Sequence, residues 1–178
     1  GRAAERILYG HLGGEGKVFI SNTHFDTTRA NIEFSGSEAV DCLTEVGNNP
    51  KVDHPFKGNL DVSTLVSTIE KWEAENVGAV ILTVTNNSGG GQPVSMANTR
   101  EVSEICKKHG VLFVLDACRV AENSYFIKKR EKEFEDYTYK QIAQEMFSLA
   151  DGCTMSAKKD AMVNMGGFLA LNDEKLAD

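Results

Sequence analysis

An acidic and a basic residue at the end of an apolar run are the first candidates for chemistry in this chain. Asp116 and Arg119 follow the run 111–115, which reads VLFVL. A carboxylate at this point either caps the next helix or contacts a ligand. The guanidinium three residues later either points at the same site or is a surface charge. The residues themselves leave both alternatives open.

Two adjacent lysines, Lys158 and Lys159, form the second candidate segment. Lysine pairs are usually solvated. A lysine that is partly desolvated near other cations, however, has a lowered pKa and becomes a nucleophile for carbonyl carbons. The hydroxyl of Ser156, shortly before the pair, could donate a hydrogen bond to an anion. The segment is therefore either a solvated surface or a site of covalent binding.

The third candidate segment is the glycine-rich loop 87–91, which reads NSGGG. It lacks the Lys-Ser/Thr pair of a phosphate-binding P-loop, and it does not match GxGxxG. Glycines allow the backbone to approach a ligand closely, which suits a bulky flat molecule. An ordinary tight turn explains them equally well.

The remaining candidates lie in the first 30 residues. Phe25 stands among polar residues, as either a local anchor or a stacking platform. Its neighbour His24 could act as an acid or base, although a hydrogen-bonded structural histidine is the simpler interpretation. Gly1 and Arg2 precede a helical segment, and helix N–H groups together with a guanidinium favour phosphate.

Taken together, these residue types suit a cofactor with an anionic end, a flat ring and an electrophilic carbon. An aspartate would address a ring nitrogen, an aromatic side chain would cover one face of the ring, and a lysine would form an imine. These are the requirements of pyridoxal phosphate (PLP).

The elements that must position these residues alternate between strands and helices. Strands are predicted at 17–20, 31–34, 39–43, 79–84, 111–115, 153–155 and 168–171. Helices are predicted from residue 3, over 61–75, from 95 to Gly110, and around Ile142, Met146 and Leu149, with 23–29 as a turn and 47–58 as a loop. This alternation predicts an α/β fold with a mostly parallel sheet and helices on both faces. Ligands of such sheets bind beyond the carboxyl ends of the strands, where the three candidate segments lie.

Composition limits the partners. The net charge of -7 argues against a nucleic-acid-binding surface, which is usually basic. No apolar run approaches the roughly 20 residues that a membrane span needs. The four cysteines form no CxxC pair, which favours reduced thiols and a cytoplasmic protein. We therefore expect a small-molecule substrate, with neither nucleic acid nor membrane as a partner.

Longer motifs resemble a known family. The runs NNSGGGQPVSMAN, DACRVAENSYFIKKRE and TMSAKKDAMVNMGGF resemble the β-eliminating lyases, which include tryptophanase and tyrosine phenol-lyase. GRAAE and HFDTTR match in the same order, so the resemblance covers essentially the whole chain. It implies a PLP-dependent enzyme of the aspartate aminotransferase fold (fold type I). Residues 1–178 would be part of its large domain, with an N-terminal segment and a C-terminal small domain lying outside them.

The resemblance also implies roles for individual residues. Lys159 would bind PLP as an imine and later act as a base, with Lys158 as a neighbouring active-site lysine. Asp116 would bind the pyridine nitrogen. Arg119 and Asn87 would contact the phenolic oxygen of the cofactor.

The other end of the cofactor and a metal ion complete this implied site. Phe25 would stack on the ring, and Gly1, Arg2 and Ser156 would hold the phosphate. Asn164 would contribute its backbone to the site of an activating monovalent cation, potassium. Members of the family are homotetramers with active sites at subunit interfaces, so the resemblance implies the same assembly at full length.

The family's reaction is β-elimination from an amino acid, which releases pyruvate and ammonium. Asp26, directly after Phe25, resembles the tryptophanase branch, where it would orient or protonate the indole of L-tryptophan. Tyrosine phenol-lyases tend to have threonine there. DGCTMS and VNMGGF lean toward that second branch, so elimination of phenol from L-tyrosine is the alternative. An aminotransferase of the same fold, or a catalytically silent fragment or binding module, is also open.

Overall fold

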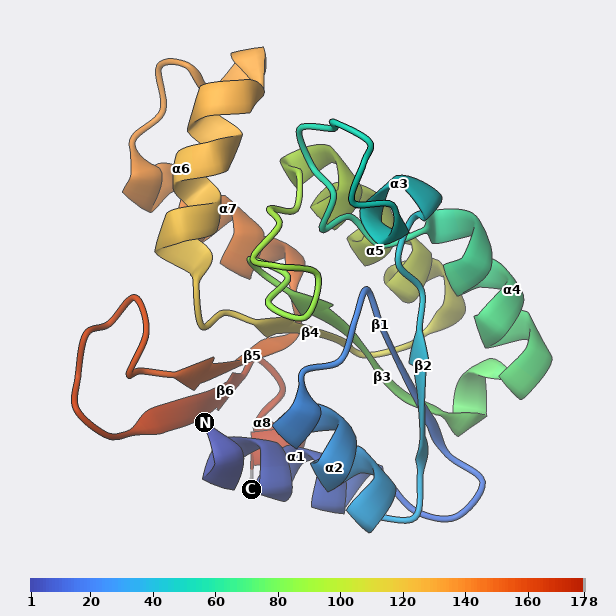
Figure 1. Cartoon of the computed structure of the whole chain (residues 1–178). Coiled ribbons are helices and arrows are strands. Elements are labelled where there is room, and N and C mark those ends of the chain that lie inside the picture. The colour runs from blue at the N-terminus through green and yellow to red at the C-terminus, as the bar shows by residue number, and fades with distance from the viewer. Residues whose placement is uncertain (178) are drawn as a thin grey trace.

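The computed structural model describes residues 1–177, which form a six-stranded sheet of order β2-β1-β3-β4-β5-β6 (Figure 1). The first five strands of this order are parallel, and β6 is antiparallel to β5. The strands are β1 Val18–Ser21, β2 Glu38–Asp41, β3 Val77–Thr83, β4 Phe113–Asp116, β5 Gly152–Ser156 and β6 Gly167–Leu171. This confirms the expected α/β fold with a mostly parallel sheet.

Helices cover both faces of this sheet. They are α1 Arg2–Leu12, α2 Asp26–Phe34, α3 Glu45–Asn48, α4 Val62–Trp72, α5 Met96–His109, α6 Val120–Arg130, α7 Tyr139–Leu149 and α8 Glu174–Ala177, with 3-10 turns at Ala74–Asn76 and Lys132–Phe134. In Figure 1, α1 and α2 lie together below the sheet, whereas α4, α5 and α7 lie on its other side. None of the helices in the described part of the chain has the length and apolar character required to span a lipid bilayer.

Strand β3 shows why its sequence is an unbroken apolar run. Its side chains alternate between two cores: Ala79 and Ile81 pack with α1 and α2, whereas Val80 and Leu82 pack with α4 to α7. Because both faces of a parallel sheet are buried, polar residues do not alternate with apolar ones. The run ends at Thr83, where the strand reaches the edge that carries the candidate segments.

The prediction of a strand at 31–34 and a turn at 23–29 is wrong, because α2 spans most of both segments. Threonine, asparagine and isoleucine in this segment favour helices only weakly. Tertiary contacts decide instead: Ile32 is fully buried against α1, and Thr28 donates its hydroxyl to Glu5 at 2.6 Å. Helix α6 was not predicted from its sequence, and α3 occupies the start of the expected loop 47–58.

Asn22 links the carboxyl ends of β1 and β3, at the edge of the sheet where the candidate segments lie. Its side-chain amide donates to the carbonyl of Thr83 at 3.0 Å and to that of Gly58 at 2.8 Å. Its side-chain oxygen accepts the N–H of Thr83 at 3.0 Å. Asn22 is fully buried, so no water replaces these bonds if they are lost.

Asn22→Ala is expected to lower the free energy of unfolding by about 3 kcal/mol, because it leaves buried backbone groups of Thr83 and Gly58 unpaired. Urea unfolding followed by circular dichroism measures this loss. The control is Asn48→Ala, since the Asn48 side chain is exposed and is expected to contribute less than about 0.5 kcal/mol. Equal losses in the two variants would contradict the role given to Asn22.

Candidate functional site

A cavity of about 580 Å³ lies where β3, β4 and β5 end. Nine residues expected to contact a cofactor line it: Gly1, Arg2, Phe25, Asn87, Asp116, Arg119, Ser156, Lys158 and Lys159. The structure thus gathers segments that are as much as 158 positions apart in sequence (Gly1 and Lys159). Asp26, the first residue of α2, and Asn164, in the β5–β6 loop, are both exposed and do not line this cavity.

Asp116 is the last residue of β4 and is only 7% exposed. Burial raises the pKa of its carboxyl group, and the charge of Glu5 adds to this effect, whereas a hydrogen bond from Cys118 and the charge of Lys159 act in the opposite direction. The carboxylate accepts the N–H of Cys118 at 3.4 Å and none from α6. This favours contact with a ligand over capping of the following helix.

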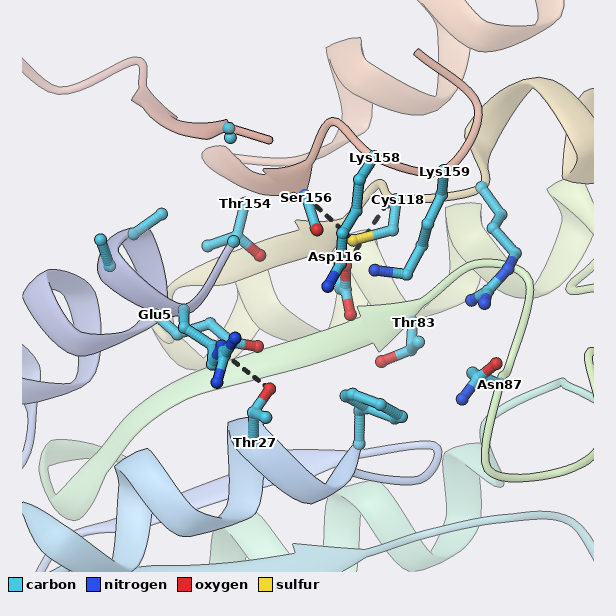
Figure 2. Close-up of a pocket in the computed structure, with 18 of the residues that line it drawn as sticks. Glu5, Thr27, Thr83, Asn87, Asp116, Cys118, Thr154, Ser156, Lys158 and Lys159 are labelled. Atoms are coloured by element: carbon cyan, nitrogen blue, oxygen red, sulfur yellow. Dashed lines mark hydrogen bonds between the residues drawn. The ribbon is translucent and has the colours of Figure 1, made fainter. Parts of the chain in front are cut away.

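Both lysines of the second segment follow β5, and Figure 2 shows their side chains pointing into the cavity beside Asp116. Lys158 is exposed, and Lys159 is half-buried. Among residues 1–177, neither amine has a carboxylate within ion-pairing distance. The amine of Lys159 is therefore available to react with a carbonyl group of a ligand.

The N-terminus of α1 and the end of β5 form a narrow cradle. A Cβ atom placed on Gly1 would lie 2.7 Å from the Cβ of Ser156, and one on Gly167 would overlap the backbone N of Gly1. Both positions therefore require glycine. The start of a helix, the guanidinium of Arg2 and the hydroxyl of Ser156 together suit a phosphate group.

The glycine-rich loop is held against the segment before α2. Ser88 donates its hydroxyl to the carbonyl of His24 at 3.1 Å, and Asn86 donates its side-chain amide to the hydroxyl of Thr23 at 3.1 Å. Gly90 and Gly91 have positive φ angles of 87° and 73°, so the turn itself explains these glycines. The loop brings Asn87 to the cavity that Phe25 also lines.

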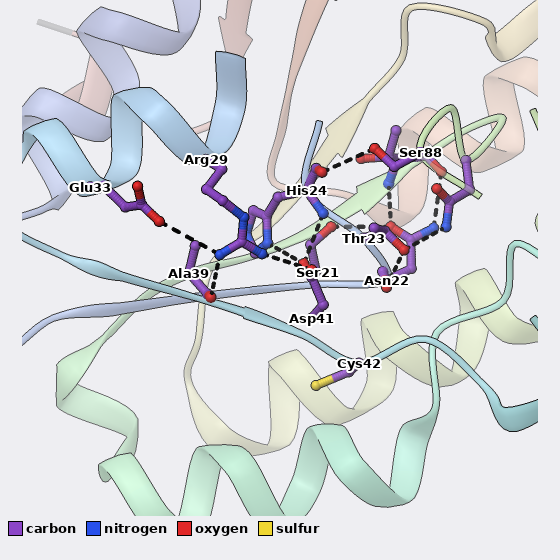
Figure 3. A network of polar contacts seen from close by, with 12 residues as sticks. Ser21, Asn22, Thr23, His24, Arg29, Glu33, Ala39, Asp41, Cys42 and Ser88 are labelled. Atoms are coloured by element: carbon purple, nitrogen blue, oxygen red, sulfur yellow. Dashed lines mark hydrogen bonds and ion pairs between the residues drawn. The ribbon is translucent and has the colours of Figure 1, made fainter. Parts of the chain in front are cut away.

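His24 has a structural role. Its ring nitrogen Nδ1 lies 2.6 Å from a carboxylate oxygen of Asp41 (Figure 3). Its side chain is buried, and it is not among the residues that line the cavity. Burial acts to raise the pKa of Asp41, but the hydrogen bonds from His24 and the charge of Arg29 lower it overall. The histidine therefore links the segment that carries Phe25 to Asp41, the last residue of β2.

Glu5 and Cys118 line the cavity but were not predicted from the sequence. Glu5 is buried and accepts the hydroxyls of Thr27 at 3.0 Å and Thr28 at 2.6 Å, which ties α1 to α2 (Figure 2). The sulfur of Cys118 accepts the N–H of Ser156 at 3.1 Å. A signal for Glu5 was present, because residues four apart share one helical face and Glu5 stands four after Gly1.

The residues of the cavity fit PLP. The cradle has no room for a side chain at Gly1, and the Arg2 guanidinium and the Ser156 hydroxyl are hydrogen-bond donors beside it, which suits the phosphate. The buried carboxylate of Asp116 has no cation paired with it in the described part of the chain, which suits a protonated ring nitrogen. Lys159 would supply the amine and Phe25 an aromatic face, since both line the same cavity.

The known sequences that are similar to this chain point to one family of enzymes. Residues 1–178 match the sequence model described as "Beta-eliminating lyase". The chain is 56% identical to a tryptophanase of Salinibacter ruber over 99% of its own length and 37% of that protein. It is 48% identical to a tyrosine phenol-lyase of Pasteurella multocida over 99% of its own length and 38% of that protein.

Solved structures are similar in fold at low sequence identity. A cystathionine gamma lyase of Micromonospora echinospora has a TM-score of 0.62 at 18% identity, with 99% of this chain and 38% of that chain covered. An aminotransferase of Streptoalloteichus hindustanus has a TM-score of 0.59 at 17% identity, with 98% and 40% covered. These likenesses confirm the expected fold class.

The raised pKa of Asp116 predicts how stability depends on pH. Because the pKa of Asp116 is higher in the folded protein than in the unfolded chain, this residue destabilises the fold as pH rises above the unfolded pKa of about 3.9. In the absence of cofactor, Asp116→Asn is expected to raise the melting temperature at pH 7, and the gain is expected to shrink toward pH 4.5.

Asp61→Asn is the control, because its expected change in melting temperature at pH 7 has the opposite sign. Hydrogen bonds from Ser63 and Thr64 lower the pKa of Asp61, so that residue stabilises the fold above its unfolded pKa and the contribution is lost as pH falls. Its asparagine variant is expected to melt at a lower temperature at pH 7. A melting temperature of Asp116→Asn below that of the unmodified protein at pH 7 would contradict the account of Asp116.

Proposed function

Because this chain belongs to the β-eliminating lyase family, we propose that it is the cofactor-binding part of a PLP-dependent enzyme that cleaves L-tryptophan to indole, pyruvate and ammonium. The observation that carries this proposal is the convergence of Lys159, Asp116 and the Gly1–Ser156 cradle on one cavity. The chain spans 37% to 39% of the relatives that it matches. We therefore infer that residues 1–178 form part of a large domain, which an N-terminal segment and a small domain complete.

Different residues of the cavity would bind different parts of the cofactor. PLP, when bound, supplies an electron sink for negative charge at the α-carbon of an amino acid. Gly1, Arg2 and Ser156 would hold its phosphate, and Phe25 would cover one face of its ring. Asp116 would keep a proton at the ring nitrogen, which makes the ring a stronger electron acceptor. Arg119 and Asn87 would contact the phenolic oxygen.

Lys159 has two tasks in this proposal. Its amine would hold PLP covalently, and, when free, it would take the proton from the α-carbon of the amino acid as a general base. Lys158, which points into the same cavity, adds a second positive charge near the anionic groups of cofactor and substrate (Figure 2). Asp26 would help to orient or protonate the indole, which then leaves from the β-carbon.

Support for tryptophan comes from the relatives. Three tryptophanases are 51% to 56% identical to the chain, against 48% for the tyrosine phenol-lyase of Pasteurella multocida. Asp26 is exposed and directly follows Phe25, which lines the cavity. The 48% identity to that relative keeps elimination of phenol from L-tyrosine as the second candidate.

We also infer that a second copy of the protein covers the β5–β6 loop. Met162 and Met165 are 87% and 85% exposed there, which is unusual for such apolar side chains. Asn164 lies between them, and its backbone carbonyl is proposed to bind potassium when the tetramer forms.

The four cysteines are unpaired, which is usual for the cytoplasm, where we expect the enzyme.

Covalent capture of PLP tests the core of this proposal. The full-length protein is expected to develop a visible absorption band with PLP, and borohydride is expected to fix the cofactor on Lys159, as located by peptide mass mapping. Lys159→Arg abolishes the adduct because a guanidinium is not nucleophilic. Lys140→Arg, outside the cavity, keeps it. Absence of an adduct on Lys159 would favour a catalytically silent binding module.

Replacement of Asp26 tests the substrate. Asp26→Ala is expected to lower kcat/KM for L-tryptophan about 100-fold, because it removes a group that aids proton transfer to the leaving indole. Indole and pyruvate release measure this, with phenol release from L-tyrosine as the parallel assay. Asp53→Ala, an exposed acid outside the cavity, serves as the control. Unchanged tryptophan turnover in Asp26→Ala would show that the role is wrong.

A further inference from the structure

Asp160, the residue directly after Lys159, connects the β5–β6 loop to the segment that follows Asp116. Its carboxylate accepts hydrogen bonds from the backbone N–H groups of Ala121, at 2.7 Å, and Glu122, at 3.0 Å. Its own N–H donates to the carbonyl of Cys118 at 3.4 Å. The β5–β6 loop is thereby bound to the start of α6, although the two are nearly 40 residues apart in sequence.

Helix α6 depends on these bonds because its own sequence provides no cap. The residue before the helix, Arg119, makes no capping hydrogen bond with its side chain. The N–H groups of Val120 and Asn123 donate to nearby backbone carbonyls at 3.2 Å and 2.9 Å. The two N–H groups between them are the ones that Asp160 accepts, so one carboxylate completes the first turn. A negative charge is favourable at this end of a helix.

The β5–β6 loop depends on the same bonds. The other backbone hydrogen bonds of its residues lie within the loop: for example, Ala157 donates to Gly166 at 3.1 Å, and Val163 donates to Ala157 at 3.1 Å. Within the described part of the chain, Asp160 is the one residue of this loop, 157–166, whose side chain makes a hydrogen bond. Within the described residues, no other side chain of this loop makes a hydrogen bond that links the Lys159 segment to the start of α6.

We propose that Asp160 is a positioning residue for the cofactor lysine. By capping α6 it holds the backbone of Lys159 in register with Asp116 and Arg119, so that the amine meets the cofactor carbonyl in the correct geometry. It acts through its neighbours, since its carboxylate is engaged with the helix. The inference rests on the proposed function, in which Lys159 captures PLP.

The rate of covalent capture tests this inference. The visible band is followed after mixing the full-length protein with increasing PLP. In Asp160→Ala the limiting rate is expected to fall about tenfold to 100-fold, because small displacements of a reacting group have large effects on rate. The half-saturating PLP concentration is expected to stay the same, because the phosphate cradle at Gly1 and Ser156 is intact. Asp160→Asn keeps an acceptor oxygen and is expected to restore the rate.

Asp61→Ala is the matched control. The carboxylate of Asp61 caps α4 by accepting the N–H of Thr64 at 2.8 Å, and it does not line the cavity. Both alanine variants lose a helix cap, so both are expected to melt at a lower temperature, but only Asp160→Ala is expected to capture PLP slowly. Before PLP is added, faster amide hydrogen exchange at Ala121 and Glu122 in Asp160→Ala is expected to report the lost cap.

Several results would overturn the inference. One is an unchanged limiting rate in Asp160→Ala, and another is an equally slow rate in Asp61→Ala. A rate in Asp160→Asn as low as that in Asp160→Ala would also exclude positioning through the cap. If the unmodified protein fails to capture PLP on Lys159, the proposed function itself is wrong, which is a distinct result because it appears before any variant is compared.

Discussion

The buried carboxylate of Asp116 at the end of β4 is the constraint on which the rest of the site depends. Burial raises its pKa, and no cation lies within ion-pairing distance of it in the described residues. A buried group of this kind destabilises a protein unless a partner compensates it. A protonated ring nitrogen is such a partner, and the other residues of the cavity lie where the remaining parts of the same cofactor would be.

The parallel order of β3, β4 and β5 makes this arrangement possible. Parallel neighbours end at one edge of the sheet, so Thr83, Asp116 and Ser156 face one cavity although they come from distant segments. The N-terminus of α1 then closes that edge, and the absence of side chains at Gly1 and Gly167 lets it approach β5. Two side chains fix the elements to each other: Glu5 joins α1 to α2, and Asp160 joins the lysine loop to α6.

The local parts of this account were predictable from the sequence, and the non-local parts were not. The run 111–115 followed by Asp116 indicates a buried strand with a polar end, and Ser95 with Gly110 marks both ends of α5. Helix α2 was missed because its stability comes from Ile32 packed against α1, and α6 was missed because its cap lies nearly 40 residues away. The roles of Asp26 and Asn164 rested on a family resemblance, and neither residue lines the cavity.

The protonation state of the cofactor nitrogen tests the central claim most directly. The measurement is the nitrogen-15 chemical shift of PLP labelled at its ring nitrogen and bound to the full-length protein at pH 7. If Asp116 governs the site, the shift is that of a protonated nitrogen, and in Asp116→Asn it moves to the value of a neutral pyridine. A neutral ring nitrogen in the unmodified protein, or an unchanged shift in the variant, would contradict the account.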